Sequence, residues 1–372
     1  MSDGVTAITV ADAGLTDHNA DLVDYAGSGQ RTIERCLRRG HALQRAARYE
    51  EAAHAYQLAL QFDRHNWEAR VGYNRTIRRH VPRWHFEMMH DEERADLYDK
   101  AIRHIVSPDH LVLDVGTGSG LLAMMAARAG AGHVVACEAQ PTVAEVATRI
   151  IATAGYDQRV TVVPKMSTDM RVGVDLPRRA DILVTETVDC GLLGEGILGT
   201  VAHAREHLLT EDAIIVPGRA RVLAQLVESL SLHHKNHVGE LHGFDLSGFN
   251  ELYSMEYFDS RLRRHPHRLL SEPFEVFGFD FHRDGPDGRR TELTVTPTAA
   301  GTCHAIVFWF ELDLIPGMTL TNSPEHPTTH WKQAVQCLPV PIHVEPGERH
   351  RLDVRHDGLR IHFTVADAEV TA

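Results

Sequence analysis

Strand-like and helix-like spacings of hydrophobic residues alternate along the middle of the chain. Short apolar runs such as 111–115 and 180–187 are typical of buried strands, and segments with helical spacing lie between them. Strands that alternate with helices favour a doubly wound α/β domain with a parallel sheet. We therefore predict a Rossmann-like α/β domain over 82–216.

The pattern changes after Pro217, where short strand-like runs are separated by glycine, proline and aspartate. This pattern predicts an antiparallel β-sandwich or barrel-like domain over 217–372. A polar insertion at about 231–266 interrupts it, and long insertions in compact domains usually form lids or interfaces. We expect a homodimer through this arm, because its aromatic side chains need a place to be buried. These side chains are Phe244, Phe249, Tyr253 and Tyr257.

The segment 29–81 has helical spacing throughout. One helical face carries the residues Tyr49, Ala52, Tyr56 and Ala59. With Gly40 upstream, the segment is similar to a tetratricopeptide repeat, in which small residues lie where two helices cross. An ordinary helical hairpin explains the pattern equally well, because one and a half repeats do not form a stable solenoid alone. The polar segment 1–28 predicts a flexible tail.

Composition and charge narrow the classes of function. The chain has 372 residues, of which 43% are hydrophobic, and a formal net charge of −13. An acidic chain lacks the basic face that phosphate binding requires, so we expect no nucleic-acid partner. No apolar run approaches the roughly 18 residues that cross a bilayer, and no signal peptide is present, so we expect no membrane partner. Five scattered cysteines fit the reducing cytoplasm, and the histidines show no metal-binding spacing, so we predict no metal.

A glycine run separates the predicted strand 111–115 from the helix that follows it. Its residues are Asp114, Gly116, Gly118 and Gly120. Glycines let a ligand approach the backbone at a helix N-terminus, although a tight turn without a ligand is the alternative. The spacing departs from GxGxxG, which disfavours a dinucleotide oxidoreductase. Glu138, at the end of the next predicted strand, can accept both ribose hydroxyls. This set is similar to the S-adenosylmethionine site of class I methyltransferases.

Two acidic residues flank a glycine-containing loop after the fourth predicted strand. Glu186 ends that strand and Glu195 opens the next helix, so the loop can turn both carboxylates toward one point. Two carboxylates around one cavity are costly unless a cation joins them or one takes a proton. The planar, permanently charged guanidinium group matches such a pair. The alternative is a helix-start acid at Glu195 and a surface residue at Glu186.

Two further segments carry candidate site residues. A Thr-His-Trp segment at 329–331 lies in a proline-rich loop of the β-domain, and Met88, Asp91 and Arg94 lie in a helical stretch before the α/β domain. This stretch could place an arginine near a ligand carboxylate, or it could be an amphipathic docking helix. Together, the four motifs resemble the protein arginine methyltransferase family over roughly 82–370.

The resemblance implies methyl transfer from S-adenosylmethionine to an arginine guanidino nitrogen, with S-adenosylhomocysteine as the second product. Glu186 and Glu195 would be catalytic and bind the guanidinium, and Trp331 would line the same site. A pair of His330 with Asp91 would brace the site and accept the proton. Glu138 would bind the ribose and Arg94 the methionine carboxylate. The full set of implied cofactor ligands is Met88, Arg94, Asp114, Gly116, Gly118, Gly120, Glu138, Met166 and Ser167.

The segments LVTETVDCGLLGEG at 183–196 and KMSTDM at 165–170 look most like the monomethylating and the repeat-bearing branches of the family. Ser167 departs from the acidic residue that many members have near the adenine. Overall similarity and high arginine usage suggest the bacterial free-arginine methyltransferases of streptozotocin-type natural-product biosynthesis. We therefore predict a cytoplasmic enzyme that converts free L-arginine to Nω-methyl-L-arginine. Protein arginine is the alternative substrate, and a non-catalytic repeat-bearing scaffold is the remote alternative.

Overall fold

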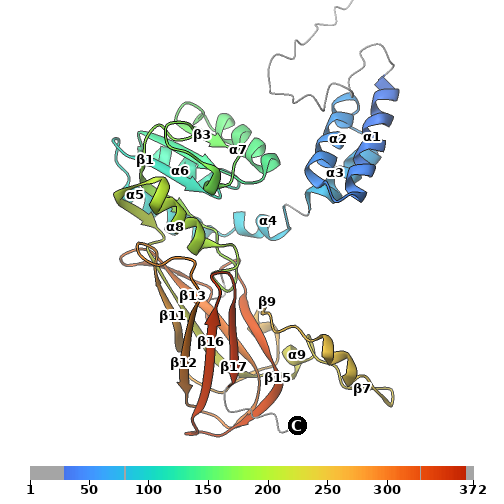
Figure 1. The fold of residues 1–372 in the computed structure, drawn as a ribbon, viewed down its shortest axis with the longest axis vertical. Coiled ribbons are helices and arrows are strands. Elements are labelled where there is room, and N and C mark those ends of the chain that lie inside the picture. Colours follow the sequence, from blue (N-terminus) through green and yellow to red (C-terminus); the bar gives the residue numbers. More distant parts are fainter. Residues whose placement is uncertain (1–28, 79–80, 327, 366–372) are drawn as a thin grey trace, which may run out of the picture. The chain divides into compact units, whose positions relative to one another are not determined.

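The computed structural model describes residues 29–78, 81–326 and 328–365 (Figure 1). The predicted flexible tail at 1–28 lies outside these residues. The chain divides into two compact units between His85 and Phe86, and each is described by itself. None of the described helices is both long and apolar enough to cross a membrane.

The N-terminal unit contains three packed helices, which confirms the predicted helical character of this segment. They are α1 (Gly29–Arg45), α2 (Tyr49–Phe62) and α3 (Trp67–Ile77), and the short helix α4 (Trp84–Met89) follows. Tyr56 is fully buried between two glycines. A Cβ atom on Gly40 would lie 2.6 Å from the Tyr56 ring, and one on Gly72 would lie 2.4 Å from it. The small residues therefore let the helices close around one aromatic ring, while the tetratricopeptide interpretation stays a prediction.

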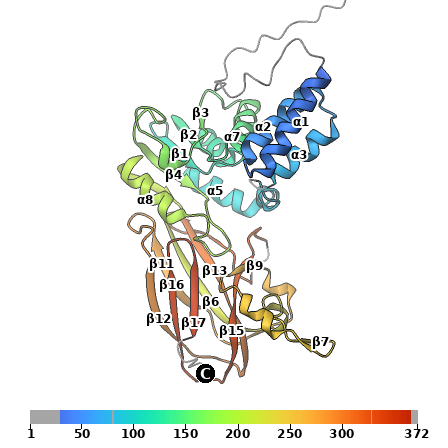
Figure 2. The same cartoon turned by 45° about the vertical axis from the view of Figure 1, so that its right-hand side comes forward.

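The second unit begins with a five-stranded sheet in the order β3-β2-β1-β4-β5, and every neighbouring pair is parallel. All five residues of β1 are buried, as expected for a central strand covered on both faces. The predicted doubly wound parallel sheet is confirmed (Figure 2). Its strands are β1 (Leu111–Val115), β2 (His133–Cys137), β3 (Val160–Val163), β4 (Ala180–Thr185) and β5 (Leu209–Val216). Its helices are α5 (Glu92–Ile105), α6 (Leu121–Ala129), α7 (Pro141–Thr153), α8 (Ile197–His207) and the short η2 (Ser167–Asp169).

Two antiparallel sheets form the body of the β-domain, in agreement with the predicted sandwich or barrel-like domain, and a two-stranded sheet of β7 and β8 lies in the arm. The larger sheet has the order β10-β6-β13-β15-β9, with β11 on β6 and β14 on β13, and the smaller has the order β12-β16-β17. The side chain of Gln336 in β15 joins them, because it bonds both backbone groups of Phe363 in β17, at 2.7 and 2.9 Å. The strands are β6 (Arg219–Glu228), β11 (Phe274–Asp280), β12 (Arg289–Val295), β13 (Gly301–Ile315), β14 (Met318–Thr321), β15 (Gln333–Val344), β16 (His350–His356) and β17 (Ile361–Val365).

The predicted arm projects from the side of these strands (Figures 1 and 2). Phe244 and Phe249 are 71% and 68% exposed, as the prediction of an interface requires. Tyr253 and Tyr257 correct that prediction, because their hydroxyls donate within the chain to the Cys337 carbonyl at 2.6 Å and to the Asp189 carboxylate at 2.7 Å. The elements here are α9 (Leu230–His233), β7 (Glu240–Leu241), β8 (Phe244–Asp245), η3 (Ser247–Leu252), β9 (Phe258–Ser260), η4 (Leu262–Arg264) and β10 (Arg268–Leu269).

Candidate functional site

The predicted motifs meet at the carboxyl ends of β1 and β4. The strand order reverses between these two neighbours, and ligands of open α/β sheets bind at such a point. The glycine run follows β1, and the loop 186–195, which we call the acidic loop, follows β4. The N-terminus of α5 and the β-domain residues Asn322, His330 and Trp331 contact the same region.

The glycine run adopts a backbone that only glycine tolerates readily. Gly116, Gly118 and Gly120 have φ angles of +74°, +55° and +83°. A Cβ on Gly116 would lie 2.9 Å from Thr187, and one on Gly120 would lie 2.8 Å from Ile151, so packing excludes side chains at both ends. A Cβ on Gly118 would have its nearest neighbour only at 4.0 Å. The backbone is therefore most open at Gly118, as a cradle for a ligand requires.

Glu138 follows β2 and holds the glycine run in place. One carboxylate oxygen accepts the Gly118 N–H at 3.1 Å, and the other accepts the Gln140 N–H at 2.9 Å. Each carboxylate oxygen has a second lone pair, so the group can still accept hydroxyl donors. The geometry fits the predicted ribose contact, since the carboxylate is oriented and lies beside the open backbone.

Asp114 lies at the end of β1 and is 1% exposed. Its Oδ2 accepts the hydroxyl of Thr117 at 2.5 Å, whereas its Oδ1 has no partner among the described residues. Burial raises the pKa of Asp114 to about 7. Most buried oxygens in native proteins accept a hydrogen bond, so this one has capacity for a donor from a bound ligand. The residue thus fits a place in the predicted cofactor site.

The remaining predicted cofactor residues differ in accessibility. Met166 and Ser167 follow β3 at the start of η2, where Met166 is 52% exposed and Ser167 is 6% exposed. Met88 lies half-buried in α4. Because β3 is parallel to β1 and β2, its carboxyl end lies at the same edge of the sheet as the glycine run.

Arg94 and Glu186 form a buried ion pair that no local sequence pattern predicts. The Arg94 Nε donates to Glu186 Oε2 at 2.5 Å, and an Arg94 Nη donates to the same oxygen. The two side chains are only 5% and 6% exposed. The predicted roles of Arg94 toward the methionine carboxylate and of Glu186 toward the substrate guanidinium stay predictions, and the structure adds that the two side chains pair with each other. The pair shows that the Glu186 carboxylate lies where it accepts a planar guanidinium.

Glu195 lies at the other end of the acidic loop and reaches solvent, although protein atoms crowd its carboxyl group. This loss of hydration, together with the charges of Glu186 and Asp189, raises the pKa of Glu195 to about 7. That both carboxylates face one point stays a prediction, and the influence of the Glu186 charge on the Glu195 pKa supports it. A cation placed between them would favour ionisation of Glu195.

Asp91 and His330 lie together, as the resemblance implies. Asp91 caps α5, because its Oδ1 accepts the Arg94 N–H at 3.0 Å. Its Oδ2 accepts the backbone N–H of His330 at 2.8 Å and lies 2.9 Å from the ring Nδ1. Burial alone would raise the pKa of Asp91, but the hydrogen bonds from His330 and Arg94 outweigh it and lower the pKa to about 2.

The β-domain holds the acidic loop through its backbone. The indole Nε1 of Trp331 donates to the Val188 carbonyl at 3.1 Å, and the Asn322 side chain donates to the Cys190 carbonyl at 2.9 Å. Trp331 is 6% exposed and packs edge-on against Phe310. Trp331 therefore supports the acidic loop, and its predicted place in the lining of the substrate site stays a prediction.

Asp189, which is not among the predicted site residues, organises the acidic loop. Its Oδ1 accepts the N–H groups of Gly191 and Gly194 at 3.1 and 2.8 Å. Its Oδ2 accepts the Tyr257 hydroxyl at 2.7 Å and lies 3.6 Å from Arg360. An aspartate two residues before a glycine is a recognised turn signal, so the local bonds were detectable in the sequence. The contacts with Tyr257 and Arg360 were not, because those residues lie in the arm and in the hairpin between β16 and β17.

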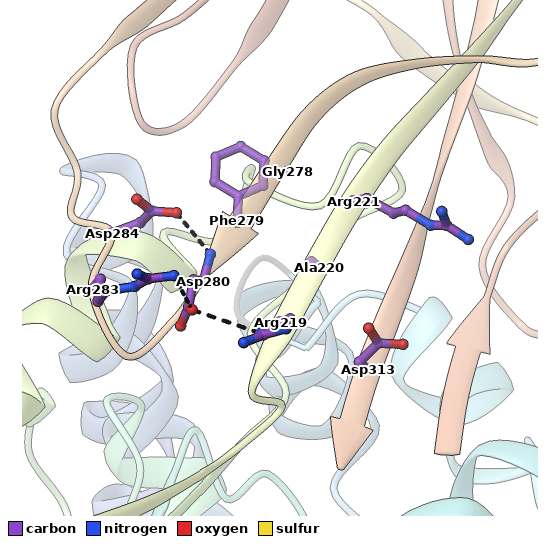
Figure 3. A pocket seen from close by; sticks show the side chains of 9 residues that line it. All are labelled: Arg219, Ala220, Arg221, Gly278, Phe279, Asp280, Arg283, Asp284 and Asp313. Atoms are coloured by element: carbon purple, nitrogen blue, oxygen red, sulfur yellow. Dashed lines mark hydrogen bonds and ion pairs between the residues drawn. The ribbon is translucent and has the colours of Figure 1, made fainter. Parts of the chain in front are cut away.

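A cavity of about 440 Å³ lies elsewhere, over the ends of β6, β11 and β13 (Figure 3). Among its charged residues, Asp280 pairs with Arg283 at 2.8 Å and with Arg219 at 3.6 Å. None of the predicted site residues lines it, so we assign it no role in the chemistry.

Comparison with sequence families gives two matches that follow the two parts of the second unit. Residues 218–367 match the model for the arginine methyltransferase oligomerization subdomain. Residues 97–235 match the model for ribosomal protein L11 methyltransferase.

Individual relatives and solved structures point the same way. The arginine N(omega)-methyltransferase of Streptomyces achromogenes subsp. streptozoticus is 44% identical over 276 residues, which cover 74% of this chain and 76% of that protein. Protein arginine N-methyltransferase 7 of Drosophila ananassae is 32% identical over 74% of this chain, which spans about half (47%) of that relative's length. The Trypanosoma brucei PRMT1 enzyme–prozyme heterotetrameric complex with AdoHcy superposes with a TM-score of 0.66 and 25% identity, covering 76% of this chain and 93% of that one. Arabidopsis thaliana protein arginine methyltransferase 10 shares the fold, with a TM-score of 0.59 and 24% identity over 73% of this chain and 86% of that one.

Proposed function

Because this chain belongs to the arginine methyltransferase family, we propose that it methylates one terminal guanidino nitrogen of free L-arginine, giving Nω-methyl-L-arginine. The observation that carries the proposal is the Glu186 carboxylate, which binds the planar guanidinium of Arg94 and lies near Glu195. The choice of free arginine is supported by the 44% identity to the Streptomyces enzyme over most of its length. Placement in the cytoplasm is supported by five unpaired cysteines.

The residues around the glycine run fit S-adenosylmethionine. The open backbone at Gly118 and the oriented carboxylate of Glu138 would hold the ribose end, and the buried Asp114 would take a donor at its free oxygen. Arg94 is already paired with Glu186, so it would bind the methionine carboxylate while it keeps this ion pair. The cofactor supplies an electrophilic methyl group on a positively charged sulfur.

Glu186 and Glu195 act on the substrate by position and charge. They hold the guanidinium and concentrate its positive charge on the nitrogens they bind, which leaves more lone-pair density on the nitrogen that is methylated. Glu195 binds best when ionised, so the raised pKa couples substrate binding to loss of its proton. After transfer, the product sheds a proton, and His330 is placed to accept it at Nε2 because Nδ1 faces Asp91.

A homodimer through the arm is part of the proposal. Phe244 and Phe249 leave an apolar surface that is exposed in the single chain. The match to an oligomerization subdomain supports association of this part of the chain.

Protein arginine stays as the second candidate substrate. The Drosophila relatives are protein arginine methyltransferases, and helices α1 to α3 could offer a peptide-binding surface. Mass spectrometry with S-adenosylmethionine separates the two candidates. We expect free arginine to gain the mass of one methyl substitution, with the Glu186→Gln variant as the inactive control. Methylation of a Gly-Arg-rich peptide alone would contradict the choice of free arginine.

A further inference from the structure

The α-carboxylate of a free amino acid is repelled by the carboxylates of the acidic loop. Arginine carries an α-carboxylate about 7 Å from its guanidinium carbon when extended, since each bond contributes a little over 1 Å. The loop that would bind the guanidinium contributes three carboxylates, from Glu186, Asp189 and Glu195. These charges repel a fourth carboxylate, so recognition of the amino acid needs a cation beside the loop.

Among the residues that the structure describes, Arg94 and Arg360 contact the acidic loop, and their guanidinium groups differ in exposure. Arg94 is 5% exposed and is already paired with Glu186. The side chain of Arg360 is 38% exposed, and its nearest carboxylate oxygen, on Asp189, is 3.6 Å away. One Nη of Arg360 also donates to the Tyr257 hydroxyl at 3.3 Å. Arg360 therefore combines a long ion pair with access to solvent, so its guanidinium has capacity for a further anion.

Gly194, directly before Glu195, leaves the space that the Arg360 guanidinium occupies. A Cβ on Gly194 would lie 2.4 Å from an Nη of Arg360, so the guanidinium lies against the loop backbone at this glycine. The same guanidinium lies over the Tyr257 ring, 5.4 Å from its centroid. At the hairpin tip, Asp357 accepts the backbone N–H of Arg360 at 2.6 Å. These contacts orient the cation before any ligand binds, which lowers the entropic cost of recognition.

We propose that Arg360 binds the α-carboxylate of the amino-acid substrate and thereby selects free arginine over guanidines that lack this group. The inference rests on the function proposed above, and it names the specificity determinant of that same site. A guanidinium offers a carboxylate two parallel N–H donors, which lysine or a neutral side chain does not. Tyr257 and Asp189 position Arg360, whose side chain stays 38% exposed beside the acidic loop.

The test compares arginine with agmatine, which keeps the guanidine and an amine but lacks the carboxylate. The variant is Arg360→Gln, and the matched control is Arg355→Gln on the adjoining strand β16, where Arg355 pairs with Asp353 at the surface. In the wild type we expect a lower KM for arginine than for agmatine. Arg360→Gln should raise KM for arginine about 10- to 100-fold, as expected for loss of a charge-assisted pair, with little change in kcat. Its kinetics with agmatine and both activities of the control should stay unchanged.

Three results would overturn the assignment. An equal loss with arginine and agmatine would mean that Arg360 serves only to position Asp189 and the loop. An unchanged KM for arginine would place the carboxylate contact elsewhere. A wild-type enzyme that methylates peptide arginine but neither free arginine nor agmatine would refute the proposed function itself. This result comes from the wild type alone and is therefore distinct from a failure of the Arg360 assignment.

Discussion

Arg94 and Glu186 form an ion pair across 92 positions of sequence, with 5% and 6% of their side chains exposed. The pair joins the helix that precedes the sheet to the loop that follows β4. It makes the two ends of the acidic loop different, because Glu186 has an internal cation, while lost hydration of the carboxyl group and the charge of Glu186 raise the pKa of Glu195. Two carboxylates that look equivalent in the sequence are therefore expected to respond differently to substitution.

Glu186→Gln should reduce the free energy of unfolding, whereas Glu195→Gln should not. The first leaves the Arg94 guanidinium buried without a counter-charge, which typically costs about 3–5 kcal/mol. The second removes a like charge from the neighbourhood of Glu186 and Asp189. Both should abolish turnover, because each removes one side of the guanidinium site. Urea denaturation and methyl-transfer assays of both variants test this, and equal stabilities would contradict the distinction.

Glu138→Ala should weaken cofactor binding. The variant loses the ribose contact and also frees the N–H groups of Gly118 and Gln140, and each charge-assisted bond contributes about 1.5–3 kcal/mol. Calorimetric titration with S-adenosylhomocysteine measures the loss, which should be at least about tenfold in Kd. Glu145→Ala on the exposed face of α7 is the control and should bind as the wild type does. Wild-type affinity in the Glu138 variant would refute the assignment.

Asp91→Asn should destabilise the protein in a pH-dependent way. The native pKa of Asp91 is about 2, below its ordinary value of 3.8, so the carboxylate stabilises the fold above about pH 4 and this contribution disappears as pH falls toward 2. The shift corresponds to about 2 kcal/mol at neutral pH. Urea denaturation should show a difference from wild type at pH 7 that shrinks toward pH 3. Asp96→Asn, on the exposed face of α5, should show no such trend.

Arginine affinity should rise with pH through about 7 and level off above it. Below this value Glu195 is protonated in the free enzyme, and guanidinium binding must displace that proton. Calorimetry near pH 6.5 in buffers of different ionisation enthalpy should therefore detect proton release on binding. The Glu195→Gln variant should lose that proton release. It retains Asp114, a second carboxyl group with a pKa of about 7, and so distinguishes the two groups. Proton release that persists in the variant would assign the titration to Asp114.

Phe244→Ser combined with Phe249→Ser should convert a dimer into a monomer. Both side chains are more than two-thirds exposed in the single chain, so their replacement removes apolar surface that only a partner would bury. Light scattering at micromolar concentration measures the mass. Val174→Ser, which changes another highly exposed apolar residue outside the arm, should leave the dimer intact. A wild-type monomer would refute the predicted assembly.

The local sequence pattern was sufficient to predict the helices and strands of the fold and to locate the motifs. The strand 111–115 and the positive φ angles of Gly116, Gly118 and Gly120 follow from hydrophobic spacing and from glycine's conformational freedom, which act over a few residues. The likeness to a known family then placed Glu138, Glu186 and His330 at one site. The helical spacing at 29–81 likewise predicted helices, although it did not distinguish a repeat from a hairpin.

Only the tertiary structure decided which partners these groups have. Arg94 meets Glu186 across 92 positions, Tyr257 meets Asp189 across 68, and Trp331 meets the Val188 carbonyl across 143. No short-range pattern encodes such pairs, because they depend on how the sheet, the arm and the β-domain pack around the acidic loop. For the same reason, Tyr253 and Tyr257 were assigned to an interface, whereas packing within the chain already provides their hydroxyls with acceptors.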